Sequence, residues 1–113
     1  MKSEVAPVVC LTDFGQIQQL PDYLLNSVIA LEDALDISTN GVYKSISLEV
    51  VSDRVRSFTE KFGSDFLGLL YGGSVNGQNA SELSKIVGLN GLLVGNASLE
   101  PGEFYQVIKK YIS

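Results

Sequence analysis

Two short apolar segments, each ending in small residues and followed by a helical pattern, limit what this chain can fold into more than any other feature. The first spans residues 69–77 (LLYGGSVNG) and the second spans residues 92–99 (LLVGNASL). A strand that ends in a glycine turn and opens a helix directs backbone N–H groups and the positive end of a helix dipole to one place. Two such turns side by side predict a phosphate site. The alternative is two tight turns that bind no ligand.

The remaining segments predict a regular alternation of strands and helices. Residues 5–11, 27–32, 65–71 and 91–94 are apolar runs typical of strands buried on both faces of a parallel sheet. Residues 47–62 predict a helix with Ser47 as its N-cap and Gly63 as its stop. Apolar residues recur along it at steps of three and four: Leu48, Val51, Val55, Phe58 and Phe62.

Two further helices are expected in the C-terminal part. One begins at Asn76 or Asn79 and runs to Gly88, and the other opens with Pro101 at its first position. The last helix presents a single apolar stripe, formed by Phe104, Val107, Ile108, Tyr111 and Ile112. Residues 14–26 predict only loops and one short helix, because Pro21 interrupts the pattern. The order of elements indicates one α/β domain with a parallel sheet over residues 1–113.

Composition excludes several classes of function. The chain has 113 residues and a formal net charge of −5, which argues against nucleic acid or an anionic membrane as a partner. It contains no histidine and no cluster of acidic residues at ligand spacing, so no metal and no cofactor are expected. No window approaches the length of a membrane span and no signal peptide is recognised, so a cytoplasmic location is expected. The single cysteine, Cys10, is expected to be a buried, reduced strand thiol.

The paired motifs resemble the seventh and eighth strand ends of the triosephosphate isomerase family, whose patterns are roughly YGGSVN and VGGASL. Residues 6–13 (APVVCLTD) resemble the fifth strand, and residues 27–32 (SVIALE) resemble the sixth. The resemblance covers nearly the whole chain but only the C-terminal half of the family's fold. It therefore implies half of a (β/α)8 barrel, the fold named after this family, with four strands and about three full helices.

The resemblance also implies roles for individual residues. Glu32 matches the family's general base, which moves a proton between adjacent carbons of a triose phosphate in glycolysis and gluconeogenesis. An exposed carboxylate at a strand end is the alternative for this residue. Tyr71 matches the group that latches the closed lid. The implied phosphate-binding residues are Ser38, Gly73, Ser74, Gly95 and Asn96.

The chain departs from the family at several of these positions. Asn96 stands where the family has glycine, and Thr12-Asp13 replace the Gly-Glu pair that ends the fifth strand. In the family, the segment after Glu32 is a mobile lid that closes over the substrate and excludes water. In this chain, Asp33 and Asp36 of that segment would repel a phosphorylated substrate. The family's catalytic histidine and lysine belong to the other half of the barrel, and Lys44 lies on the wrong segment to replace the lysine.

Three functional hypotheses follow. The chain is the C-terminal part of a triosephosphate isomerase without activity of its own, or a relative that only binds phosphate, or a structural, oligomer-forming domain. The expected partners are a small phosphorylated substrate or phosphate anion, together with a second copy of the chain or a complementary N-terminal half-barrel. Four barrel strands would leave two open sheet edges and an apolar inner face, which promote association.

Overall fold

A computed structural model describes residues 6–12, 26–32, 47–62 and 66–113 of the chain. Four parallel strands form one sheet in the order β1-β2-β3-β4, with β1 at Val8–Leu11, β2 at Val28–Glu32, β3 at Gly68–Gly72 and β4 at Gly91–Leu93. Consecutive parallel neighbours are typical of a barrel, in which every crossover winds the same way, and not of a doubly wound sheet. The expected half-barrel arrangement of four parallel strands is confirmed.

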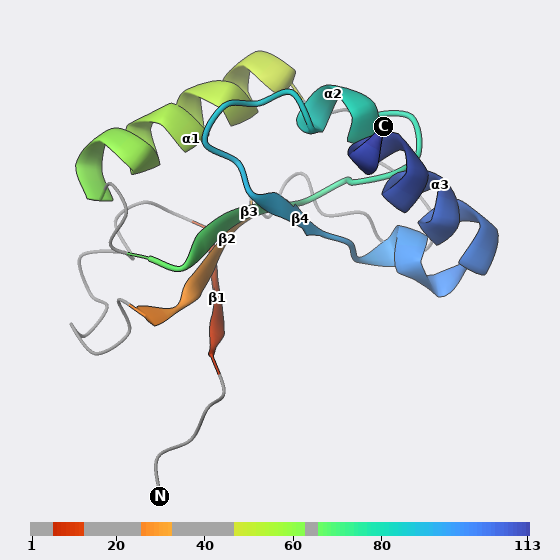
Figure 1. Cartoon of the computed structure of the whole chain (residues 1–113), viewed down its shortest axis with the longest axis horizontal. Helices are drawn as coiled ribbons and strands as arrows, with labels where there is room; N and C mark the ends of the chain where they lie inside the picture. Colours follow the sequence, from red (N-terminus) through yellow and green to blue (C-terminus); the bar gives the residue numbers. More distant parts are fainter. Residues whose placement is uncertain (1–5, 13–25, 33–46, 63–65) are drawn as a thin grey trace, which may run out of the picture.

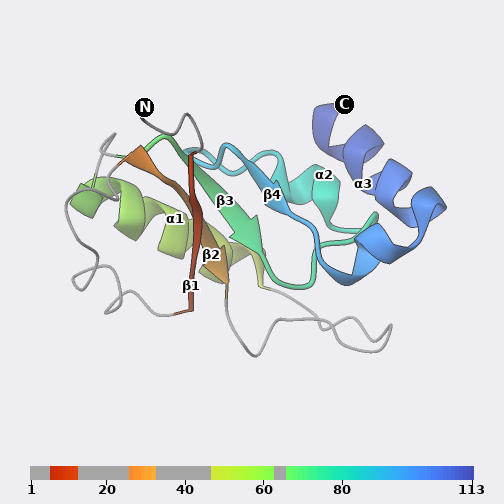
Figure 2. The same cartoon turned by 90° about the horizontal axis from the view of Figure 1, so that it is seen from below.

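The helices follow the strands in sequence and lie in an arc along one side of the sheet (Figure 1). They are α1 at Leu48–Phe62, α2 at Ala80–Leu83 and α3 at Pro101–Ile112, with the 3-10 helix η3 at Asn96–Leu99 before α3. Seen from below, the sheet keeps α1 behind β2 and β3, while α2 and α3 lie beyond β4 (Figure 2). Among the described residues, therefore, only one face of the sheet is covered by helices.

Alternation along the strands separates a core face from an opposite face. Ile29, Leu31 and Tyr71 point to the helices and are almost completely buried. They pack with the apolar stripe of α1, whose Val51, Val55 and Phe58 are buried as the periodicity predicts, with Leu48 and Phe62 partly buried. Ser47 caps this helix, since its Oγ accepts a hydrogen bond from the Val50 N–H at 3.3 Å. Gly63 lies outside the described residues.

Cys10 is exposed, and the expectation of a buried strand thiol is wrong. The reason is its place in the sheet. β1 is an edge strand among the described elements, and Val8 and Cys10 point away from the helices while Val9 and Leu11 point toward them. A compact apolar run predicts burial on both faces, but the described helices cover only one face of β1.

One helix expectation is corrected as well. The helix after β3 comprises only Ala80–Leu83, because the preceding residues form a hydrogen-bonded turn and the chain turns again through Gly88, whose φ is 94°. Helix α3 begins at Pro101 as expected, but its stripe is not uniformly buried. Val107 is buried and Tyr111 partly so, whereas Ile108 and Ile112 are 43% and 76% exposed.

Candidate functional site

The carboxyl ends of three neighbouring strands bring the candidate residues to one end of the sheet. The register places Glu32 of β2 beside Gly72 of β3, and Gly72 beside Leu93 of β4. Gly73 and Ser74 follow β3 directly, and Gly95 follows β4 after one residue. The two turns and the carboxylate thus lie at the same edge, which is the ligand end of parallel βα units.

The Glu32 side chain lies across Gly72. A β-carbon added at Gly72 would stand 2.6 Å from Glu32 Oε1 and 2.9 Å from its Cγ, so any side chain there would displace the carboxylate. The glycine after Tyr71 is therefore needed for a close approach between two strand ends, and not for a positive φ. Glycine at this position in turn allows Glu32 to lie over the end of the sheet.

Cys10 is the other neighbour of this carboxylate. Partial burial, and secondarily the negative charge of Glu32, raise the pKa of the Cys10 thiol above its usual value. The thiol lies on the same face of the sheet as Glu32, because Cys10 pairs with Ala30, two residues before it. The raised pKa keeps the thiol neutral near pH 7, so Cys10 itself adds no second negative charge beside Glu32.

The turn after β3 is held by its own side chains. Asn76 Oδ1 accepts hydrogen bonds from the N–H groups of Gln78 at 2.8 Å and Asn79 at 3.2 Å. Asn79 Oδ1 accepts the Asn76 N–H at 2.9 Å, and its Nδ2 donates to the Ser74 carbonyl at 2.6 Å. The N–H groups of residues 76–79 are thus engaged in hydrogen bonds, that of Gly77 with Glu103. The candidate anion-binding residues Gly73 and Ser74 lie at the start of this turn.

Both turns are fixed by buried residues. Ser74 is completely buried and the next residue, Val75, belongs to the core. In the second turn, Ala97 is buried between Asn96, which is partly buried, and Ser98. Gly95 precedes η3, its carbonyl accepts the Ser98 N–H at 2.9 Å, and a β-carbon there would meet nothing within 4 Å. Neither turn opens a long helix directly, so the helix-dipole contribution is smaller than expected and the backbone N–H groups must carry anion binding.

One described residue of the candidate site, Tyr71, lies apart from this edge. Tyr71 is buried in the core, on the helix side of β3, whereas Glu32 and Gly72 share the opposite side. Ser38 lies outside the described residues, as do the lid and its Asp33 and Asp36. The latch role of Tyr71 and the lid contact of Ser38 remain predictions.

The structure adds three residues that the sequence did not single out for this site. Gly72 makes room for Glu32, Cys10 lies beside it, and Glu103 of α3 accepts the Gly77 N–H at 2.7 Å. The pairing of Gly72 and Glu32 could have been found from the strand register. The Glu103 contact joins residues 26 positions apart, and nothing in the local pattern predicts it.

In the part of the chain that the structure describes, no three histidine, cysteine or acidic side chains gather as a metal site would require. None of the described helices is both long and apolar enough to span a bilayer. The fold and the site together define a class: part of a parallel βα barrel, with a carboxylate and two glycine turns at the carboxyl ends of its strands.

The particular family follows from comparison with known proteins. A family model described as triosephosphate isomerase matches residues 4–111. The chain is 34% identical over 105 residues to triosephosphate isomerase of Polynucleobacter necessarius subsp. necessarius (strain STIR1), covering 90% of this chain and 42% of that protein. It is 36% identical over 107 residues to the chloroplastic enzyme of Arabidopsis thaliana, covering 88% and 34% respectively. This chain belongs to the triosephosphate isomerase family.

A solved structure supports the fold. Triosephosphate isomerase from Bartonella henselae matches with a TM-score of 0.66 and 22% identity, over 96% of this chain and 52% of that chain. The chain spans about two fifths of the length of the Polynucleobacter relative and about one third of the length of the Arabidopsis relative. The resemblance seen in the strand-end motifs is thus confirmed, and so is its restriction to part of the barrel.

Proposed function

We propose that this chain forms the phosphate-binding half of a triosephosphate isomerase-type site. The observation that carries the proposal is the common edge at which Glu32, Ser74 and Gly95 lie, in a chain that belongs to this family. The N–H groups of Gly73, Ser74, Gly95 and Asn96 bind the phosphate group of a triose phosphate. Ser38 adds an N–H when the lid closes, and Tyr71 latches the lid.

In the complete site, Glu32 is the general base. Its carboxylate removes a proton from one carbon of dihydroxyacetone phosphate or glyceraldehyde 3-phosphate and returns it to the adjacent carbon. A positioned base contributes about 10² to 10⁴ in rate, while the larger electrostatic term comes from donors aimed at the developing enediolate oxygens. The chain has no histidine for this purpose. Chemistry therefore needs groups from another half-barrel.

The isolated chain should consequently show no isomerase activity above background. A coupled assay with glyceraldehyde 3-phosphate at high protein concentration measures this, with Glu32→Gln as the matched control. Turnover that disappears in Glu32→Gln would contradict the proposal, because it would mean that this half had assembled a competent site by itself.

Phosphate binding is tested separately from catalysis. A ligand that binds only the folded state stabilises it by about 2.7 kcal/mol at a hundredfold excess over its dissociation constant. Millimolar inorganic phosphate should therefore raise the melting temperature, whereas chloride at equal ionic strength should not. Identical melting curves in the two salts would leave only a structural role for the turns.

An oligomer-forming role is the second proposal, and a separate observation favours it. On and just before α3, Leu99, Ile108 and Ile112 are exposed apolar side chains, and β4 has one strand neighbour among the described elements. A second copy of the chain would cover this surface and the edges of β1 and β4 that no described strand pairs with. A complementary N-terminal half-barrel is the other occupant that fits.

Sedimentation of the chain alone distinguishes these cases. We expect a dimer at micromolar concentration that dissociates in Ile108→Glu/Ile112→Lys. Val50→Lys is the matched control, because Val50 is also an exposed apolar residue but lies on α1. A monomeric wild type that gains mass only when an N-terminal half-barrel is added would replace the second copy by that partner.

A further inference from the structure

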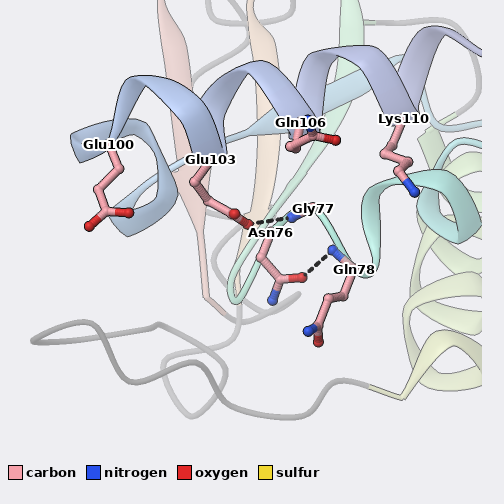
Figure 3. Close-up of a pocket in the computed structure, with 7 residues that line it drawn as sticks. All are labelled: Asn76, Gly77, Gln78, Glu100, Glu103, Gln106 and Lys110. Carbon is pink, nitrogen blue, oxygen red and sulfur yellow. Dashed lines mark hydrogen bonds between the residues drawn. The ribbon is translucent and has the colours of Figure 1, made fainter.

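A hydrogen bond connects the first glycine turn to helix α3, which follows the second glycine turn in the sequence. Glu103 lies in the first turn of α3, and its Oε1 accepts the Gly77 N–H at 2.7 Å (Figure 3). Helix α3 starts two residues after η3, which carries Asn96 of the second turn. The contact therefore ties the turn after β3 to the segment that directly follows β4.

The packing around this bond is close. A β-carbon at Gly77 would stand 3.1 Å from Gln106 Cβ and 3.2 Å from Glu103 Oε1, so the backbone of the first turn rests directly on α3. A side chain at this position would require the facing atoms of α3 to shift by a few tenths of an ångström. The loop and the helix line a polar hollow of about 380 Å³, and the hydrogen bond between Glu103 and Gly77 lies at this hollow (Figure 3).

Glu103 serves the turn and not its own helix. A glutamate at the third position of a helix often returns to the N–H of the N-cap residue. Here the N-cap is Glu100, whose N–H is directed to the Ala97 carbonyl at 3.5 Å, and no side-chain cap is formed. The Glu103 carboxylate instead accepts the N–H of Gly77, 26 residues away in the sequence.

From Gly77 the constraint passes to the candidate anion site. The neighbouring Asn76 is bound by Asn79, and Asn79 Nδ2 holds the Ser74 carbonyl at 2.6 Å. We infer that Glu103 is a positioning residue for the proposed phosphate site: it fixes the turn that contains Ser74 relative to the turn that contains Asn96. This inference rests on the proposed function, since it assigns a role toward the same anion.

The role depends on an oxygen acceptor and not on charge, which gives a direct test. Glu103→Ala removes the acceptor, while Glu103→Gln keeps an oxygen at the same place without the charge. Glu100→Ala is the matched control, because Glu100 is an exposed carboxylate lining the same hollow. Inorganic phosphate is titrated into each protein while the amide resonances of Ser74 and Asn96 are followed by NMR, and Gly77 amide exchange is measured without ligand.

We expect Glu103→Ala to weaken phosphate binding about three- to tenfold, the equivalent of one hydrogen bond, and to speed Gly77 exchange. Glu103→Gln and Glu100→Ala should both resemble the wild type. Unchanged affinity in Glu103→Ala would overturn the inference alone, and so would equal losses in Glu103→Ala and Glu103→Gln. Absence of binding by the wild type would overturn the proposed anion site and this inference with it, and the ligand-free Gly77 exchange would then show whether Glu103 holds the turn at all.

Discussion

The two faces of the sheet are built from the same four strands but differ in their residues and in how those residues are buried. The face toward the helices holds Ile29, Leu31 and Tyr71, all buried in the core. The opposite face holds Cys10, Ala30 and Glu32, together with Gly72, and Cys10 is exposed. Large apolar residues stabilise the first face by packing, whereas on the second face Gly72 leaves room for the Glu32 carboxylate. The alternation of side chains along each strand thus separates the face that packs in the core from the face that carries Glu32.

The largest expected difference between the faces is in stability. Ile29→Ala should lower the free energy of unfolding by about 2 to 5 kcal/mol, because Ile29 is fully buried and a cavity would remain. Val8→Ala on the opposite face should cost less than about 1 kcal/mol, since Val8 is 52% exposed. Urea denaturation followed by circular dichroism measures both. Equal losses would mean that the second face is also packed.

The next effect concerns the close approach on the second face. Gly72→Ala should destabilise the protein by about 1 to 3 kcal/mol, because the new methyl group overlaps the Glu32 side chain. Gly68→Ala, in the same strand, is the matched control, since its nearest contact would be an ordinary 3.7 Å.

A double-mutant cycle sharpens this result. If the overlap with Glu32 causes the loss, Gly72→Ala should cost clearly less in a Glu32→Ala background, because the clashing atoms are gone. Strictly additive losses in the cycle would show that Glu32 does not lie over Gly72.

A smaller effect contrasts two serines. Ser27, just before β2, is completely buried, and its Oγ has no hydrogen-bond partner among the described residues, so Ser27→Ala should be neutral or stabilise by up to about 1 kcal/mol. Ser47→Ala should instead cost about 1 kcal/mol, because Ser47 caps α1. Thermal melts of the two variants compare them directly. A clear loss in Ser27→Ala would reveal a partner for its hydroxyl.

The smallest effect is on the reactivity of Cys10. Its thiol pKa is raised by partial burial and then by Glu32, so Glu32→Gln should lower that pKa and speed alkylation at pH 8 by less than about tenfold. A raised pKa in the folded state contributes stability that is fully present below the unfolded-state pKa of about 9.0, and this contribution is lost as the pH rises through the folded-state pKa. Labelling rates measured from pH 7 to 10 test the shift, and Glu103→Gln, remote from the thiol in sequence, serves as the control.

Much of the fold could be predicted from the sequence, because the signals are local. The apolar spacing in residues 47–62 predicts both the helix α1 and the residues it buries, and Pro101 marks the start of α3. The strand-end motifs place Glu32 and the two turns at one edge, since carboxyl ends of parallel strands lie together. Periodicity and turn chemistry act over a few residues, so they can be read without knowledge of the distant chain.

Only the tertiary structure decided which groups meet across the fold. It exposed Cys10 by placing β1 at an edge of the described sheet, shortened α2 to four residues, and left Ile112 on α3 uncovered. It also joined Gly77 to Glu103. Each of these outcomes depends on whether another element covers a surface or supplies a partner. Burial and long-range hydrogen bonds are properties of pairs of segments, and a local pattern specifies only one member of each pair.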